Sequence, residues 1–416
     1  RLTQTGRIVA RWAAEVLAAA ARLDAGIASL RSETARHLDV AASLTIATLA
    51  LAPAALAQRV PWSYGRRADP LLEPRFKVFD IEWRHHLVER ALLEYAPREV
   101  AGPAVDDLTG ELVVPTRDGR VRLFTSTGRE IWATSIGARP TGTPLMTDAA
   151  IFLGGTDGVL HALARFDGAE AWSAPLGAAV VEPPAAAGGR IFVGTDQDAV
   201  HAFDEETGAS IWTYRRDTGR GLRIRGGTGV SVADGRVYAG FSDGTVVALA
   251  EADGRILWEA RLAGGTVDKF PDSDAVPVHR DGTVYATVYN AGTWALDAAT
   301  GRVRWRADTR GASSLAFGGD LLLVGGAGAW ALDPATGAIV WTVDLGAGST
   351  LQPLPVGGLV VLPGSHGMLF VERATGRPLR VFDPGSRFSS RPARRGSHLY
   401  ALSNFGYLYA LRVTTR

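Results

Sequence analysis

The sequence predicts an all-β protein built as a closed eight-bladed β-propeller. The first observation is a near-repeat, because WALDAATGRVRW at 294–305 returns 36 residues later as WALDPATGAIVW at 330–341. The second is a looser copy of the same text elsewhere in the chain. The third is the abundance of Gly, 49 in 416 residues, which suits many tight turns. Recurrence with a period of roughly 40 residues is typical of repeat architectures, so the fold follows from the repeated unit.

The looser copies are marked by a Gly that is followed four residues later by Trp. These Trp residues are spaced by 36 to 47 residues, and they are Trp132, Trp172, Trp212, Trp258, Trp305 and Trp341. A seventh copy has Gly376 with Arg380 in the Trp position. Because the Trp recurs once per unit, we predict that these side chains pack between neighbouring blades and have no catalytic role.

Each unit has the same order of elements, as residues 189–214 show. An apolar run at 191–193 is followed by a turn and by an alternating strand around Val200. A second turn, which ends at Gly208, leads to a strand that carries Trp212. Period-two patterning between Gly-rich turns is typical of antiparallel hairpins. Three such strands and an outer fourth in about 40 residues make one propeller blade.

The last unit lacks one strand, and the N-terminal side supplies a candidate for it. The unit that starts at Gly396 provides three strands before Arg416. The segment FKVFDIEWRHHL at 76–87 belongs to no other unit and contains Trp83. We predict that this segment completes the last blade and closes the ring, which removes exposed sheet edges. The propeller is therefore assigned to residues 58–416.

Two segments precede the predicted propeller. Residues 1–37 include RIVARWAAEVLAAAARL, which predicts an Ala-rich amphipathic helix, and we assign them to an N-terminal helical extension of uncertain role. Residues 38–57 include the uncharged run VAASLTIATLALAPAALA, which ends in the small-x-small pattern of a signal-peptidase site. A run of 18 residues is also a marginal length for a membrane anchor, and that alternative stays open. Either interpretation predicts export of the propeller.

Composition limits the classes of function. The net charge is +1, which argues against a nucleic-acid-binding surface. The sequence contains no Cys, which excludes disulfides, thiol catalysis and Cys-ligated metal, and leaves no thiol for lipid attachment in the sequence given.

The repeat text resembles that of the quinoprotein-like eight-bladed propellers over roughly residues 76–416. Within that superfamily the sequence is most similar to the family of the outer-membrane assembly factor BamB. Two stretches carry the resemblance: GLRIRGGTGVSVADGRVYAGFSDGTVVAL at 221–249, and GTVDKFPDSDAVPVHRDGTVYATVYNAGTWALD at 265–297. The first matches a Leu-x-Leu-Arg-Gly segment of that family, and the second matches an Asp-x-Asp segment.

The resemblance implies a site of protein contact. The matching residues are Leu222, Ile224, Arg225, Asp272 and Asp274. In that family these loops contact the periplasmic POTRA domains of the barrel-insertion protein BamA. The resemblance therefore implies a monomeric, non-enzymatic scaffold in the periplasm, at the inner face of the outer membrane. Binding of nascent outer-membrane proteins by edge pairing is a further expectation.

Two departures from the family pattern are visible. Ile224 replaces a Leu, and no Cys is present for the lipid anchor that is usual in the family. Membrane association is therefore expected only through the partner or through the segment at 40–57.

The residues themselves also favour an interface at these two segments. Residues 215–227 contain five Arg and two aliphatic side chains, and the Trp spacing rises to 46 and 47 across the two segments, against 36 to 40 elsewhere. Long loops on a rigid scaffold often carry binding sites, although an ordinary solvated loop also explains the pattern. We hypothesise that Asp272 or Asp274 orients Arg225 for the partner, with turn chemistry after Pro271 as the alternative.

Enzymes with the same propeller form a competing class. Quinone-dependent dehydrogenases need Ca²⁺ with carboxylate ligands and often have a vicinal Cys pair, and the sequence shows neither a Cys nor a carboxylate cluster with hard-metal spacing. We therefore predict no catalytic residue, no cofactor and no metal. The second function is a periplasmic propeller that binds another protein or a polysaccharide, and a quinone-dependent dehydrogenase is the third.

Overall fold

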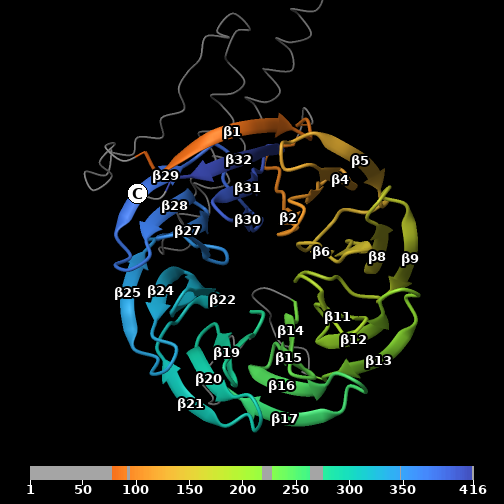
Figure 1. Ribbon diagram of the computed structural model, residues 1–416. Coiled ribbons are helices and arrows are strands. Elements are labelled where there is room, and N and C mark those ends of the chain that lie inside the picture. The colour runs from red at the N-terminus through yellow and green to blue at the C-terminus, as the bar shows by residue number, and fades with distance from the viewer. Residues whose placement is uncertain (1–76, 91–93, 218–226, 263–274, 347, 415–416) are drawn as a thin grey trace, which may run out of the picture. The chain divides into compact units, whose positions relative to one another are not determined.

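The structure is a computed structural model that describes residues 77–90, 94–217, 227–262, 275–346 and 348–414. These residues form eight four-stranded antiparallel sheets, which are arranged as the blades of a ring (Figure 1). The predicted all-β, eight-bladed propeller is therefore confirmed. Within the described ranges no helix is long and apolar enough to cross a membrane.

In blades 1 to 7 the four strands are consecutive in the chain and run from the innermost to the outermost strand (Figure 1). Blades 1 to 4 consist of β2 (Ala104–Val105), β3 (Leu112–Pro115), β4 (Arg120–Phe124) and β5 (Glu130–Ser135); β6 (Leu145–Met146), β7 (Ala150–Gly154), β8 (Val159–Ala164) and β9 (Glu170–Pro175); β10 (Ala185–Ala187), β11 (Arg190–Gly194), β12 (Ala199–Asp204) and β13 (Ser210–Arg215); and β14 (Val230–Ala233), β15 (Arg236–Gly240), β16 (Thr245–Ala250) and β17 (Ile256–Arg261).

Blades 5 to 8 repeat this order, except that the outermost strand of blade 8 comes from the other end of the described chain. They consist of β18 (Val278–Arg280), β19 (Thr283–Val288), β20 (Gly292–Asp297) and β21 (Val303–Ala307); β22 (Ala312–Gly318), β23 (Leu321–Gly326), β24 (Gly328–Leu332) and β25 (Ile339–Asp344); β26 (Leu354–Val356), β27 (Leu359–Gly364), β28 (Gly367–Glu372) and β29 (Pro378–Phe382); and β30 (Ala393–Arg395), β31 (His398–Leu402), β32 (Tyr407–Val413) and β1 (Phe79–His86).

Strand β1 repeats the register of the regular blades. It pairs antiparallel with β32, and Trp83 lies opposite Ala410 next to a register shift after Ile81. In blades 2 to 6 the Trp of the outermost strand also lies opposite an Ala of the third strand, next to a register shift. A small residue leaves space beside the large indole ring. The segment at 76–87 therefore contains an outermost blade strand that is equivalent to those of the other blades.

Each repeated Trp packs against the next blade. The indole Nε1 of Trp212 donates a hydrogen bond to the backbone oxygen of Glu251 at 3.0 Å. A Cβ atom added to Gly254 would lie 2.7 Å from the Trp212 ring, and the φ of Gly254 is +71°. Gly thus provides both the space and the left-handed backbone that this turn needs. Equivalent Nε1 bonds of 2.8 to 3.0 Å are made by Trp132, Trp172, Trp258, Trp305 and Trp341.

The hydrophobic core consists of layers between neighbouring blades. In one layer, Tyr238 and Val246 of blade 4 pack with Val284 and Leu296 of blade 5 around Trp258. Burial of each such side chain stabilises the fold by about 1.5 to 3 kcal/mol. The strength of the ring therefore depends on contacts between blades as much as on each sheet.

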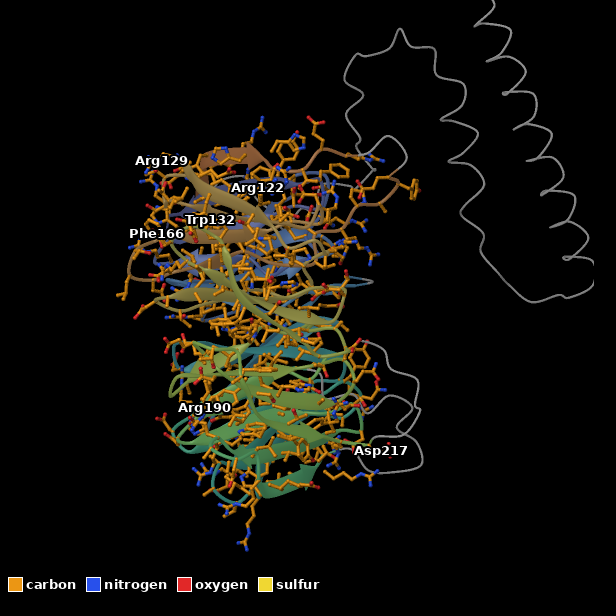
Figure 2. All side chains as sticks on the ribbon, turned by 90° about the vertical axis from the view of Figure 1, so that its right-hand side faces the viewer. Arg122, Arg129, Trp132, Phe166, Arg190 and Asp217 are labelled. Atoms are coloured by element: carbon orange, nitrogen blue, oxygen red, sulfur yellow. The ribbon has the colours of Figure 1, made fainter. Side chains whose placement is uncertain are left out.

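The antiparallel order places the turns on two faces. The turn face carries the turns between the first and second strands and between the third and fourth strands. The loop face carries the turns between the second and third strands and the connections that follow each outermost strand. Figure 2 views the ring from its edge, with Arg129, Phe166 and Arg190 along the turn face and Asp217 on the loop face.

Candidate functional site on the loop face

The two segments predicted to contact a partner belong to the loop face. The first follows β13 and precedes β14, and the second follows β17 and precedes β18, so the two connections lie on either side of blade 4. The predicted contact residues lie outside the described residues, and they are Leu222, Ile224, Arg225, Asp272 and Asp274. The hypothesis that Asp272 or Asp274 orients Arg225 therefore stays a prediction.

The residues that follow the two segments meet on the propeller. A Cβ atom added to Gly229 would lie 2.7 Å from Cα of Val276, so the chain returns from both segments to one place. Gly227 and Ala275 are the first described residues after each segment, and both line a single cavity on the loop face. The fold thus brings together the described ends of segments that are about 45 residues apart in sequence.

One Arg of the predicted basic segment has a structural role. Arg216 forms ion pairs with Asp243 at 2.9 Å and with Glu259 at 3.3 Å. Burial lowers the pKa of Arg216, but the hydrogen bonds to Asp243 and Tyr214 raise it more, so the net pKa lies above the ordinary value. Arg216 therefore fixes the chain at the start of the first segment.

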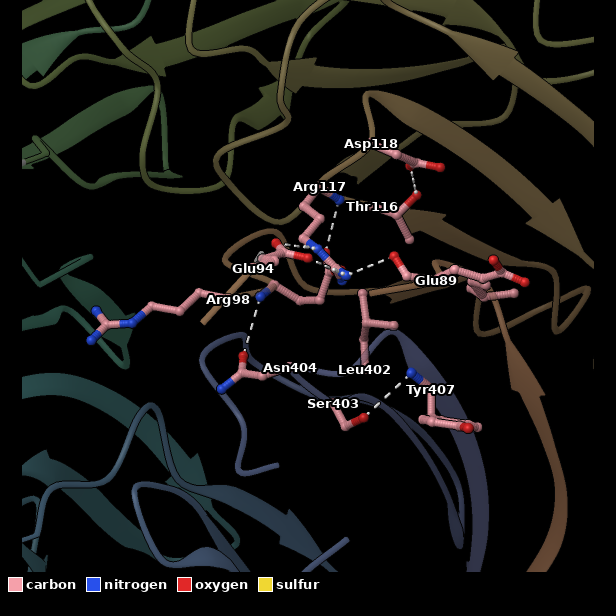
Figure 3. Close-up of polar contacts among 12 residues, drawn as sticks. Glu89, Glu94, Arg98, Thr116, Arg117, Asp118, Leu402, Ser403, Asn404 and Tyr407 are labelled. Carbon is pink, nitrogen blue, oxygen red and sulfur yellow. Dashed lines mark hydrogen bonds and ion pairs between the residues drawn. The ribbon is translucent and has the colours of Figure 1, made fainter. Parts of the chain in front are cut away.

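On the same face, a buried ion network joins blade 8 to blade 1, where the ring closes (Figure 3). Arg117, in the turn between β3 and β4, forms an ion pair with Glu99 and a second with Glu94 at 3.0 Å. The backbone N of Arg117 donates to Oε2 of Glu99 at 2.8 Å. The backbone N of Glu99 donates to Oδ1 of Asn404, in the turn between β31 and β32, at 3.1 Å. The connection that follows β1 is therefore fixed to both blade 8 and blade 1.

The burial of these side chains determines how the network contributes to the stability of the fold. The side chains of Glu99 and Arg117 are 1% and 6% exposed. Burial raises the pKa of Glu99, and the hydrogen bonds from Arg117 lower it, with a raised pKa as the net result. For Arg117 the opposite balance holds, because burial lowers its pKa but the hydrogen bonds to Glu94 and Glu99 raise it more. Such a pair is important mainly because removal of one partner leaves the other charge buried.

A cavity of about 550 Å³ lies on the loop face, among the innermost strands and connections. Six Ser side chains line it: Ser313, Ser314, Ser349, Ser365, Ser389 and Ser390. The two charged residues among its described lining, Glu182 and Arg391, form an ion pair at 2.5 Å. The wall therefore combines hydroxyl groups with apolar surface and is close to electrical neutrality.

Small residues of blade 6 and its neighbours leave the space. Gly326 ends β23 and Ala327 connects it to β24, at the positions where blade 1 has Thr116 and Arg117. Gly311 and Gly348 continue the same wall. In the described part of the chain, no group of three or more His, Asp or Glu side chains is placed to hold a metal ion.

The sequence matches a family model that is described as outer membrane protein assembly factor BamB. The match covers residues 117–343 and, in a second overlapping alignment, residues 292–415, which is most of the propeller. The chain belongs to the BamB family. The resemblance inferred from the repeats is thereby confirmed. A comparison with curated proteins gives no match.

Solved structures agree with the propeller fold of the BamB family. BamB from Moraxella catarrhalis is 20% identical, with a TM-score of 0.68, and the alignment covers 80% of this chain and 100% of that one. The quinohemoprotein alcohol dehydrogenase ADHIIG from Pseudomonas putida HK5 is 12% identical, with a TM-score of 0.63 and coverage of 81% and 77%. The quinohemoprotein alcohol dehydrogenase from Comamonas testosteroni is 14% identical, with a TM-score of 0.61 and coverage of 82% and 77%. At these identities the likeness shows the fold alone.

Two features of this BamB-family propeller were not predicted from the sequence. The first is the network of Glu94, Glu99 and Arg117. The sequence contains one signal for it, because blade 1 has the charged residue Arg117 at the turn position where blade 2 has Thr156. The second is the cavity with its Glu182–Arg391 pair, which joins residues 209 positions apart. No local pattern indicates a contact over that distance.

Proposed function

We propose that this BamB-family protein is a non-enzymatic scaffold of the periplasm that binds the POTRA region of BamA and assists outer-membrane protein assembly. The observation that supports the proposal is the close approach of the described residues that follow the two predicted contact segments. They leave the loop face on either side of blade 4, and Gly229 and Val276, which follow them, are in contact. A single partner surface can therefore reach both segments.

The residue types in the two segments suit a protein interface. Leu222 and Ile224 supply aliphatic side chains for burial, and Arg225 supplies a planar donor for a carboxylate or a backbone carbonyl. Asp272 and Asp274 supply carboxylates close in sequence to the second connection. The ion pairs of Arg216 hold the start of the first segment on the rigid sheet, which lowers the entropy lost on binding.

A binding titration tests the proposal. The chain from residue 58 onward is titrated with the cognate POTRA domains, beside an Arg225→Glu variant. We expect saturable binding by the unchanged chain and a loss of affinity of at least tenfold in the variant, because truncation of a buried charged contact typically costs about 2 to 5 kcal/mol. Arg255→Glu is the matched control, since Arg255 is exposed on the turn face.

Each outcome of the titration has a defined meaning. Equal loss of binding in Arg225→Glu and Arg255→Glu would indicate a general charge effect rather than the proposed site. Binding that Arg225→Glu leaves unchanged would keep the partner and reject the site. Absence of binding would reject the scaffold function and favour a propeller that binds another protein or a polysaccharide.

A second contact, with nascent outer-membrane proteins, is favoured by the outermost strands. Each of these strands ends its own sheet and has one unpaired edge, so, contrary to the expectation from the sequence, closure of the ring does not remove the outer edges. Each of five of them presents an aliphatic side chain that is 41% to 51% exposed: Ile131, Ile211, Ile256, Val303 and Ile339. Extended segments add to such edges by backbone hydrogen bonding. We expect Ile256→Lys with Val303→Lys to weaken binding of an unfolded barrel protein and to leave POTRA binding unchanged.

The dehydrogenase alternative is tested directly with its cofactor. Two solved propellers of similar fold are quinohemoprotein alcohol dehydrogenases. We expect no saturable binding of pyrroloquinoline quinone in the presence of Ca²⁺, and stoichiometric binding would reject the non-enzymatic function.

A further inference from the structure

We propose that the cavity on the loop face is a binding site for a short, neutral oligosaccharide. Its volume of about 550 Å³ lies within the range of small-molecule sites, which is about 300 to 1,000 Å³. The described lining of the cavity includes none of the predicted partner-contact residues, and the ligand class follows from the chemistry of the wall.

The wall offers hydroxyl groups with free hydrogen-bonding capacity. The hydroxyls of Ser313, Ser389 and Tyr289 make no hydrogen bond to a described residue, although all three residues line the cavity. Each hydroxyl can donate one hydrogen bond and accept two, which matches the hydroxyls of a sugar. Ser side chains also lose little conformational entropy when a ligand fixes them.

The single ion pair favours an uncharged ligand. Nη2 of Arg391 lies 2.5 Å from Oε2 of Glu182, so the cationic group of the described wall is already neutralised. An anionic ligand would have to displace Glu182 or lie beside it. The guanidinium keeps further N–H donors and the carboxylate keeps further lone pairs, which suit adjacent hydroxyls of one sugar ring.

One aromatic ring supplies an apolar surface. Tyr289, which lies in the turn between β19 and β20, is the aromatic residue among the described lining, and it is half-buried. The same turn position holds Arg117, Asp196 and Asn404 in other blades, so the ring is specific to blade 5. A phenol ring combines an apolar face for the C–H groups of a sugar with a polar edge.

The backbone of the wall disfavours the competing neutral ligand, an extended peptide. A peptide binds by adding to unpaired backbone groups. Here the backbone N of Gly311 donates to Tyr289 at 2.6 Å, that of Ala327 donates to Gly311 at 2.9 Å, and that of Thr350 donates to Gly326 at 2.8 Å. Side-chain hydroxyls are therefore the main groups that remain for a ligand.

Ligand-observed NMR and calorimetry on the full chain test the site. The probes are chitotriose and maltotriose, which are neutral, with trigalacturonate as the acidic comparison and triserine as the peptide comparison. We expect at least one neutral trisaccharide to bind, and trigalacturonate and triserine to bind at least tenfold more weakly. Tyr289→Leu is expected to lower the affinity at least tenfold, whereas Tyr95→Leu, whose ring is 83% exposed outside the cavity, leaves it unchanged.

A second variant keeps the test independent of the aromatic ring. Ser313→Phe fills part of the cavity and is expected to abolish trisaccharide binding while circular dichroism stays unchanged. Failure of both neutral trisaccharides to bind would overturn the proposal, as would unchanged binding in both variants. Equal binding of triserine at the same site would replace the saccharide with a peptide. POTRA binding is measured separately, so its failure and the failure of this site are distinguishable.

Discussion

The junctions between blades fall into two kinds. At six junctions a Trp of one blade packs on a Gly of the next and donates its Nε1 to a backbone oxygen three residues before that Gly, as Trp258 does with Gly301 and Ala298. The two junctions that flank blade 8 differ. Trp83 packs on Gly128 without a hydrogen bond to a described residue, and Arg380 stands where blade 7 would have its Trp.

The difference has a topological cause. A regular junction needs a turn between the third and fourth strands of the next blade, because that turn carries the Gly. In blade 8 these strands, β32 and β1, come from opposite sides of the described chain, so no such turn exists for a Trp of blade 7 to contact. Phe79 fills this junction instead, by stacking on Phe370 with ring centroids 5.0 Å apart.

The junction between blades 8 and 1 gains polar contacts instead. The side chain of Glu99 forms an ion pair with Arg117 of blade 1, and its backbone N donates a hydrogen bond to Oδ1 of Asn404 in blade 8. One connection therefore joins both blades. A Trp–Gly contact with an indole hydrogen bond is common to the regular junctions, whereas a buried ion pair completes this one. Three pairs of substitutions test that contrast.

The largest effect is expected at a regular junction. Trp258→Ala removes a side chain that is 8% exposed together with its hydrogen bond, and should lower the free energy of unfolding by about 3 to 5 kcal/mol. Arg380→Ala, at the equivalent position without a Gly partner, should change it by less than about 0.5 kcal/mol. Urea denaturation measures both. Similar losses in the two variants would show that the Trp–Gly contact has no special part in the junction.

A smaller loss is expected in the closing network. Glu99→Gln places an amide against the buried Arg117 guanidinium and should lower the free energy of unfolding by about 2 to 3 kcal/mol. Glu94→Gln changes a carboxylate that also binds Arg117 but is 30% exposed, and should cost less than about 1 kcal/mol. Guanidinium-free urea denaturation at constant salt compares them. If Glu94→Gln were the more harmful change, burial would not be the source of the effect.

The smallest effect separates Gly packing from Gly conformation. Gly254 and Gly235 have φ angles of +71° and +70°, but only an added Cβ at Gly254 meets an indole ring, since nothing lies within 4 Å at Gly235. Both Ala variants lose backbone freedom, so the additional loss in Gly254→Ala should be about 1 to 2 kcal/mol. Thermal unfolding of the pair measures this difference. Equal destabilisation would mean that the turn conformation alone requires Gly.

The sequence predicts the fold in detail because the unit is local. A Gly and a Trp four residues apart report one turn and one strand, and their recurrence reports the number of blades. Even the closing strand can be found, since the segment at 76–87 belongs to no other unit and contains Trp83, which the structure places opposite Ala410. The absence of a Trp at 380 also follows, in retrospect, from the chain order of blade 8.

Less of the candidate site than of the fold can be predicted from the sequence. The positions of the two predicted contact segments follow from Trp spacing, because extra length between successive motifs marks a long connection. The roles of Arg225, Asp272 and Asp274 remain predictions. The two other features of the loop face, the Glu99–Arg117 network and the serine-rich cavity, have no counterpart in the repeat pattern.

The sequence by itself determined the blade, its repetition and the side of the ring on which the long connections lie, because turns, strand alternation and Trp–Gly packing act over about 40 residues. The tertiary structure decided which side chains meet across the ring. Glu99 reaches Asn404 over 305 residues, and Glu182 reaches Arg391 over 209. Such contacts depend on how the closed ring brings distant connections together, and no periodicity in the chain records that distance.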